Sequence, residues 1–410
     1  MKYFSFFRNY SRLLAFAVLL AFFSSFGQTF LISFYVPEFA GAFDLTEGRI
    51  GVLYGIATVG SALLLPWTGR LIDRVSLSRY TLAVSAGLGL GGLILAVAPH
   101  WILLFAGLLI VRHCGQGLCG HIAMTSSGRY FVENRGKAVA IAGTGYPLGE
   151  ILFPALITLS IAVLGWRLSW GLSAGLIIVV LAPLALSLLR SSRRLENALP
   201  KVDSGTSDES RNWRASLLLT DYRFYVILAT LVPIGFFSTA FIFYQAVIAE
   251  SRDWGDHVFP SAFAAFAITR AMLALAIGPW IDRLTAVRLL PAHMILLLIA
   301  GAFLVFFSGE WAAYAYLICL GMSMGVGQSV ATAVWAEVYG VENLGGIRSV
   351  ASMIGVLSTA LAPLIFGMLL DFNIEVPTLL RGALVMILAL TLFSFVAASI
   401  LNRARLTKQG

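Results

Sequence analysis

The sequence predicts an all-α integral membrane protein with twelve transmembrane helices, and three observations support that prediction. Of the 410 residues, 59% are hydrophobic and only 12% are charged, whereas soluble domains carry about 25% charged residues. The mean hydropathy is +0.89. One crossing takes ~20 apolar residues, so the roughly 240 hydrophobic residues suffice for about twelve crossings. This composition excludes an ordinary water-soluble enzyme and a disordered chain.

Apolar runs separated by polar breaks place the crossings along the chain. The turn Pro99-His100-Trp101 separates the third from the fourth, and Gly165-Trp166-Arg167 separates the fifth from the sixth. No small-residue cleavage site follows the first run, so we expect it to be retained as a span. The twelve expected spans are residues 13–36, 50–69, 80–98, 101–127, 138–164, 169–189, 224–248, 258–279, 290–308, 311–337, 348–370 and 382–401.

The distribution of Lys and Arg predicts the orientation. One set of alternate segments, which includes both termini, holds 22 of these residues, and the opposite set holds four. Because basic residues accumulate on the cytoplasmic side, both termini are expected in the cytoplasm. This bias explains the net charge of +8 without a nucleic-acid partner. The clean bias in a short chain favours a bacterial inner membrane.

The longest polar stretch, residues 190–223, follows the sixth crossing. We interpret it as a cytoplasmic linker between an N-terminal six-helix bundle, residues 1–189, and a C-terminal one, residues 224–410. A regulatory loop is the alternative to a plain solvated tether.

An internal repeat relates the two halves. Gly69, Ile72, Asp73, Arg74 and Arg79 recur 209 residues later, after the second helix of the second half. The later copies are Gly278, Ile281, Asp282, Arg283 and Arg288. The same offset relates Phe34-Tyr35 to Phe243-Tyr244 and Pro154 to Pro363. Two parallel six-span repeats with a substrate site between them are a known transporter plan.

With this signature at Gly69–Arg79, the sequence resembles the major facilitator superfamily over essentially its whole length. The resemblance implies the major facilitator fold and a secondary transporter that alternates access between its two halves. It also implies a protein that is not an enzyme and needs no cofactor or metal. A membrane-bound enzyme or receptor would need a catalytic loop or an appended domain, and the loops outside residues 190–223 are all short.

The signature residues are candidates for gating. An acid at a helix end can pair with a neighbouring Arg and hold one conformation closed. Ordinary pairing of loop charges is the alternative. The candidates are Asp73, Arg74, Arg79, Arg129, Asp282, Arg283 and Arg288.

Three charged residues are expected near the membrane midplane, where ionisable side chains are functional candidates by default. Arg112, Glu150 and Arg270 each lie eleven or twelve residues into a predicted span. At ~1.5 Å per residue, all three lie about 17–18 Å from the start of their helices.

Arg270 is the first candidate for binding a substrate carboxylate through its planar guanidinium. No acid stands one helical turn before or after it, at Phe266 or Ala274. Its helix is similar to the eighth helix of the monocarboxylate branch of the superfamily, which also carries a midplane Arg. That branch commonly has an Asp where Phe266 stands. A structural Arg bonded to neighbouring carbonyls is the alternative.

Glu150 is the candidate for proton coupling. It ends the segment Gly143–Glu150, which resembles the helix 5 Gly-Pro motif found mainly in antiporters. A buried carboxyl near an Arg can bind and release a proton during transport. A static ion pair between Arg112 and Glu150 is the alternative.

Arg112 lies in Arg112-His113-Cys114-Gly115-Gln116-Gly117, which resembles the helix 4 Arg…Gln-Gly motif of the superfamily with one extra residue. Arg112 is a candidate for contacting substrate or lowering the proton affinity of Glu150. His113 and His121 could take part in proton transfer. More often, such a histidine hydrogen-bonds a neighbouring helix.

Further polar residues in the spans could line a central cavity, or instead form hydrogen bonds between helices. They are Gln28, Thr29, Tyr35, Tyr146, Tyr244, Gln245 and Gln328.

The sequence thus favours proton-coupled transport of a small organic anion, with proton-driven efflux of drugs or metabolites as the alternative. The expected partners are a small-molecule substrate, protons and the lipid bilayer. A monomer is expected.

Overall fold

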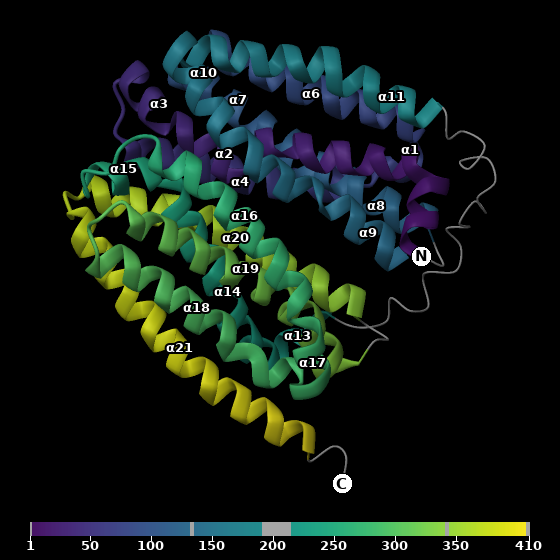
Figure 1. Ribbon diagram of the computed structural model, residues 1–410, viewed down its shortest axis with the longest axis vertical. Coiled ribbons are helices and arrows are strands. Elements are labelled where there is room, and N and C mark those ends of the chain that lie inside the picture. The colour runs from purple at the N-terminus through teal and green to yellow at the C-terminus, as the bar shows by residue number, and fades with distance from the viewer. Residues whose placement is uncertain (1, 132–134, 191–214, 341–343, 407–410) are drawn as a thin grey trace. The chain divides into compact units, whose positions relative to one another are not determined.

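The computed structural model describes residues 2–131, 135–190, 215–340 and 344–406, and these residues form helices joined by short turns, without a β-strand (Figure 1). The chain divides into two compact units, residues 1–201 and 202–410. Most of the predicted linker, residues 191–214, lies outside the described residues. The domain boundaries therefore remain a prediction.

Unit 1 contains the first half of the crossings. Its elements are α1 (Lys2–Phe23), η1 (Ser24–Gly27), α2 (Thr29–Ile32), η2 (Ser33–Tyr35), α3 (Val36–Phe43), α4 (Glu47–Thr68), α5 (Leu71–Arg74), α6 (Leu77–Val97), α7 (Trp101–Val111), η3 (Arg112–Cys119), α8 (Gly120–Tyr130), α9 (Arg135–Gly143), α10 (Gly145–Leu176), η4 (Ile177–Leu181) and α11 (Ala182–Arg190). The elements η1 and η2 are 3₁₀ turns, and η3 and η4 are π-helical.

Unit 2 contains fewer and longer helices. They are α13 (Ala215–Thr220), α14 (Tyr222–Phe243), α15 (Gln245–Glu250), α16 (Val258–Ala276), α17 (Gly278–Leu284), α18 (Ala286–Phe306), α19 (Trp311–Tyr339), α20 (Leu344–Asp371) and α21 (Val376–Leu406). One buried cluster of this unit includes Phe224, Leu290, Val330 and Trp335.

Eleven helical segments in the described part of the chain are long and apolar enough to cross a membrane. The 55-residue segment Gly136–Arg190 contains two predicted spans, the fifth and the sixth. Between them Gly165 has φ 76° and ψ 158°, which is non-helical. Because this φ favours a residue without Cβ, Gly165 divides the segment where the sequence predicts a turn. The eleven segments therefore correspond to the twelve predicted spans, and the first of them ends at Gly27, within the predicted span 13–36.

The outer surface of both units is apolar, as a bilayer requires. Large side chains such as Leu63, Val163, Leu275 and Val385 are more than half exposed. Since backbone groups in hydrocarbon must be hydrogen-bonded within the chain, such surfaces are stable only on helices or closed barrels. The helical fold and its apolar exterior agree with an integral membrane protein.

In unit 2, α16 packs closely against α19 because two glycines of α19 lie at the contact. A Cβ on Gly321 would lie 2.4 Å from the Phe266 carbonyl oxygen, and one on Gly325 would lie 2.4 Å from that of Arg270. Small residues let membrane helices approach to backbone contact. This packing fixes the backbone of α16 at Arg270.

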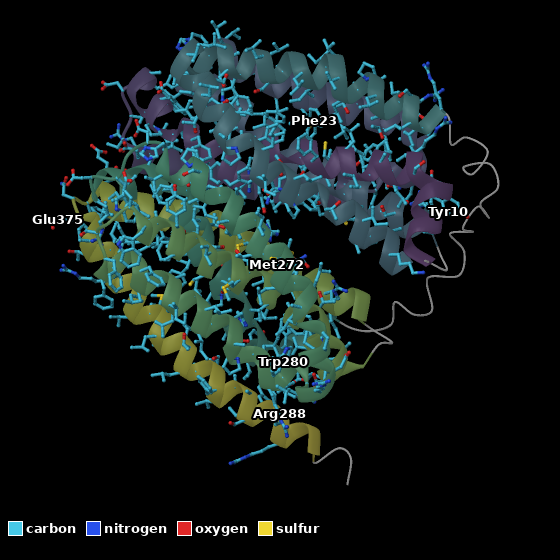
Figure 2. The ribbon with its side chains drawn as sticks, in the orientation of Figure 1. Tyr10, Phe23, Met272, Trp280, Arg288 and Glu375 are labelled. Carbon is cyan, nitrogen blue, oxygen red and sulfur yellow. The ribbon has the colours of Figure 1, made fainter. Side chains whose placement is uncertain are left out.

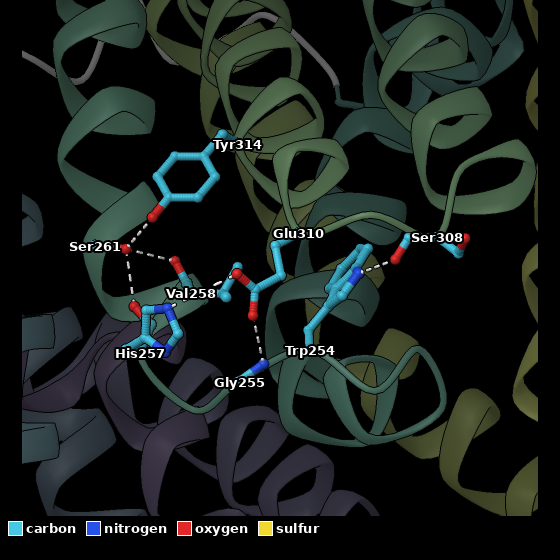
Figure 3. Close-up of polar contacts among 8 residues, drawn as sticks. All are labelled: Trp254, Gly255, His257, Val258, Ser261, Ser308, Glu310 and Tyr314. Carbon is cyan, nitrogen blue, oxygen red and sulfur yellow. Dashed lines mark hydrogen bonds and ion pairs between the residues drawn. The ribbon is translucent and has the colours of Figure 1, made fainter.

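Hydrogen bonds join two loops at one end of unit 2 (Figure 3). The Gly255 amide donates to Glu310 Oε1 at 3.1 Å, and Trp254 Nε1 donates to the Ser308 carbonyl at 2.5 Å. These bonds connect the loop before α16 to the loop before α19. The other end of this unit holds the repeated signature, and Figure 2 labels Trp280 of α17 and Arg288 of α18 there.

Candidate functional site

The polar site of unit 1 is built at a break in the first crossing. After the 3₁₀ turn η1, Gln28 is extended (φ −82°, ψ 151°), and α2 starts at Thr29. The last carbonyls of a helix lack partners within that helix. The Gly27 carbonyl therefore lies inside the membrane segment and needs a donor from another element.

The fourth crossing supplies that donor. Gly27 and Gly115 meet in backbone contact, because a Cβ on Gly27 would lie 2.3 Å from the Val111 carbonyl oxygen and one on Gly115 only 2.7 Å from the Gly27 nitrogen. At this crossing η3 is π-helical from Arg112 to Cys119. A π-helical turn holds one more residue than an α-helical turn and is frequent at functional sites.

Arg112, at the start of η3, is 3% exposed and contacts three groups. Its Nη1 donates to the Gly27 carbonyl at 2.9 Å, and its Nε donates to Thr58 Oγ1 at 3.1 Å. Its guanidinium carbon lies 4.7 Å from the centroid of the Tyr54 ring, a cation–π distance. A break in one helix, a polar face of α4 and an aromatic ring thus hold this cation in place.

Tyr54 and Thr58 are themselves held by hydrogen bonds. The Tyr54 hydroxyl lies 2.7 Å from Thr29 Oγ1, and the Thr58 hydroxyl donates to the Tyr54 carbonyl at 2.8 Å. Tyr54 is fully buried and Thr58 is 2% exposed. The hydrogen bond to Thr29 ties α4 to the segment that follows the helix break.

No carboxylate forms an ion pair with Arg112 in the part of the chain that the structure describes. The predicted alternative of a static ion pair between Arg112 and Glu150 is therefore wrong for this conformation. Arginine carries five N–H donors, and the hydrogen bonds found here engage only Nε and Nη1. Among the described residues, the Arg112 charge is balanced by dipoles and a ring rather than by a carboxylate.

His113 hydrogen-bonds a neighbouring helix, which was the alternative to a role in proton transfer. Its Nε2 lies 3.1 Å from Thr68 Oγ1, and its Nδ1 lies 3.4 Å from Ser61 Oγ. The Thr68 hydroxyl already donates to the Leu64 carbonyl, so it accepts from Nε2–H. Both ring nitrogens of a neutral His113 are thereby used in this conformation, and its role in proton transfer stays a prediction. His121 is half-buried beside Gly69, and its role in proton transfer remains a prediction.

Glu150 is 6% exposed on α10. The preceding Gly149 lies against η1, since a Cβ there would be 2.0 Å from Ser25 Oγ. Ser25 Oγ is buried and has no hydrogen-bond partner among the described residues. Because Arg112 bonds the other end of η1 at Gly27, this short element links the two charged residues of unit 1.

The remaining substrate-binding candidates fall into two groups. Tyr35 and Tyr244 are buried and hydrogen-bonded within their own units, and their role in binding substrate stays a prediction. The Tyr35 hydroxyl lies 2.7 Å from Ser169 Oγ, and the Tyr244 hydroxyl donates to the Pro363 carbonyl at 2.6 Å. Four other candidates keep accessible surface, and their roles stay predictions. Gln28, Tyr146 and Arg270 are half-buried, and Gln328 is exposed.

The two copies of the gating signature differ. Arg129 at the end of α8 pairs with Asp73 of α5. In unit 2, Asp282 is exposed and forms no ion pair with any described residue. Instead, Glu337 of α19 accepts from the Ala286 amide at 2.7 Å and caps α18.

The Asp73–Arg129 pair is too exposed to act as a strong latch. The two side chains are 61% and 39% exposed, and surface pairs of this kind contribute about 0–1 kcal/mol. Arg74, Arg79, Arg283 and Arg288 are exposed as well. A gating role for the seven residues remains a prediction.

Tyr54, Thr58 and Gly27 were missed as site residues by the sequence analysis. A usable signal existed in α4, where Tyr54, Thr58 and Ser61 repeat at helical spacing in an otherwise apolar segment. Gly27 gave no signal, because its role depends on the helix that crosses it.

The fold and the site together define a polytopic membrane transporter, with a charged group inside a bundle of apolar crossings. The sequence matches the Major Facilitator Superfamily over residues 17–255 and 225–408, and the chain belongs to that family. It therefore takes part in transmembrane transport and is not an enzyme. A curated relative from Escherichia coli (strain K12), the uncharacterized MFS-type transporter YhjX, is 23% identical over 327 residues, which cover 78% of each chain.

Two solved structures share the fold. One is a bacterial homolog of the human lysosomal transporter Spinster, in an inward-facing and unoccupied conformation, with a TM-score of 0.71 and 13% identity. The match covers 96% of this chain and 98% of that one. The other is the nucleoside transporter NupG, with a TM-score of 0.69, 12% identity and coverage of 95% and 99%. At these identities the likeness concerns the fold alone.

Proposed function

We propose that this transporter carries a small organic anion in symport with protons. The observation that carries the proposal is the buried Arg112, which has no carboxylate partner among the described residues. A cation inside a membrane bundle is costly, and such residues mark substrate and ion pathways. An anionic substrate would supply the negative charge that the described residues do not place there.

The donors of Arg112 favour a planar, two-oxygen ligand. With Nε and Nη1 held by Thr58 and Gly27, the guanidinium plane is fixed before the substrate arrives. Arginine recognises carboxylates through a rigid fork of N–H groups. Arg270 in unit 2 provides a second guanidinium of the same chemistry, as the resemblance to the monocarboxylate branch implies.

Glu150 supplies the proton step of this proposal. It is buried on α10, and η1 connects it to the Gly27 carbonyl that Arg112 holds. Protonation would remove the negative charge of Glu150 from this region. The short element η1 would transmit this change in charge to Arg112. Gly145 of the antiporter-like motif is explained by packing of α10 on α1, since a Cβ on it would lie 2.4 Å from the Val18 carbonyl oxygen. Efflux of drugs or metabolites stays the alternative.

Thermal unfolding of the purified protein with candidate ligands tests the substrate class. Small carboxylates should raise the midpoint, because a ligand at a hundred times its Kd stabilises the folded state by ~2.7 kcal/mol. Lipophilic cations serve as the comparison and should leave the midpoint unchanged. Stabilisation by the cations alone would contradict the anion proposal and favour efflux.

The Glu150→Gln variant tests the proton coupling. Uptake driven by a pH gradient should be lost in proteoliposomes, while counterflow exchange of the same anion without a gradient should persist. The reason is that the amide cannot bind and release a proton, whereas the anion site keeps its Arg. Unchanged pH-driven accumulation would remove Glu150 from the mechanism.

A further inference from the structure

An apolar groove lies on unit 1 between the third and the sixth crossing. Its volume is about 930 Å³, and α11 packs beside α6 along it (Figure 1). The wall is formed by aliphatic side chains except toward one end, where Ser187 and Arg190 of α11 lie. The lining residues include Leu82, Leu90, Leu93, Ile178, Leu186 and Arg190.

Each wall of the groove is an apolar stripe that ends in an arginine. On one wall, Ile178 of η4 and Ala182, Leu186 and Arg190 of α11 follow one another at intervals of four residues. On α6, Leu82, Ala86, Leu90 and Leu93 follow at intervals of three or four, and Arg79 continues the same face. Residues at these intervals share one side of a helix.

Arg190 lines one end of the groove, and Arg79 lies near the start of α6, outside the lining residues. The third and the sixth crossing run in opposite directions, so the start of α6 lies beside the end of α11. Arg79 and Arg190 are exposed, and none of the residues that line the groove is acidic. The groove is therefore apolar along its length and positive at one end.

We propose that this groove binds an anionic phospholipid of the surrounding bilayer, with an acyl chain along the stripes and the phosphate at Arg190. The eleven steps from Leu82 to Leu93 span ~16 Å along α6. That length matches one leaflet, which is half of the ~30 Å hydrocarbon core. An arginine near the membrane surface attracts an anionic headgroup over a zwitterionic one.

Native mass spectrometry of the purified full-length protein, extracted from liposomes with equal phosphatidylglycerol and phosphatidylcholine, tests the headgroup. Bound phosphatidylglycerol should exceed phosphatidylcholine about fivefold, the equivalent of ~1 kcal/mol for one basic residue. Arg190→Gln should abolish this preference. Arg403→Gln, at an exposed arginine of α21 outside the groove, should keep it. An unchanged preference in Arg190→Gln would overturn the proposal.

A second pair of variants tests the acyl chain. Ala86→Phe fills the groove from an exposed position and should reduce the retention of both lipids. Ala155→Phe, at an exposed alanine of α10, places the same ring elsewhere on unit 1 and should not. Equal retention in the two variants, a bound mass of a free fatty acid, or a dimer of the chain would each contradict phospholipid binding in this groove.

Discussion

Anion binding is expected to weaken about thirtyfold or more in the Arg112→Gln variant, because losing one partner of a desolvated charge pair costs ~2–5 kcal/mol. The glutamine amide can still donate to the Gly27 carbonyl, so the ligand-free fold should survive. Arg112→Lys keeps the charge but lacks the planar fork, so its affinity for the anion should fall between those of the parent protein and of Arg112→Gln. Uptake into proteoliposomes and the ligand-dependent shift in thermal unfolding measure both effects.

Arg167 offers a matched control for this experiment. Its Nη1 donates to the Ala98 carbonyl at 2.7 Å, and its guanidinium lies 4.2 Å from the centroid of the Trp166 ring. It thus combines a carbonyl and an aromatic ring, as Arg112 does, but at an exposed position. Arg167→Gln should leave anion binding unchanged. Binding that is equally weak in both variants, or unaffected in Arg112→Gln, would contradict the assignment of Arg112.

Gly27→Ala is expected to destabilise the protein more than other glycine substitutions in unit 1. Its Cβ would lie 2.3 Å from the Val111 carbonyl oxygen and 2.5 Å from the Gln116 nitrogen, which are backbone atoms of the crossing helix. Overpacking typically costs 1–3 kcal/mol, and we expect the upper end, ~3 kcal/mol, because backbone cannot rotate away. The loss of stability is measured as the drop in the midpoint of thermal unfolding, followed by size-exclusion chromatography of heated samples.

The control for this substitution is Gly175→Ala in α10. No atom lies within 4 Å of the Cβ position of Gly175, and alanine is favoured over glycine in a helix by ~1 kcal/mol. This variant should be as stable as the parent or more so. Because Gly27 also positions the carbonyl that Arg112 binds, the Gly27→Ala protein that remains folded should bind the anion less tightly than the parent does. Equal midpoints for Gly27→Ala and Gly175→Ala would show that the crossing can relax.

The number of crossings and the place of Gly165 could be predicted because each depends on local chemistry. Crossing a bilayer needs a run of apolar residues of known length, and the run is visible in the sequence. The burial of Arg112 and Glu150 was also predictable, since the rise of a helix fixes their depth. The π-helical turn η3 was not predicted, although the motif that begins at Arg112 has one residue more than the pattern it resembles.

The partners of these residues could not be predicted in the same way. Tyr35 was expected beside a cavity, but its hydroxyl meets Ser169, which is 134 residues away in the sequence. His113 was a proton-transfer candidate, and Ser61 and Thr68 lie at its ring nitrogens in this conformation. A membrane helix that is apolar on most sides has no polar face to show which direction a given side chain takes.

The sequence by itself determined an all-helical membrane protein and its spans. These follow from composition and helix geometry, which act along the chain. Only the tertiary structure decided that Arg112 holds the carbonyl at the broken end of η1, with Tyr54 beneath it and no carboxylate beside it among the described residues. That arrangement needs Gly27 and Gly115 in contact, and close approach between helices depends on two distant glycines at once rather than on either one.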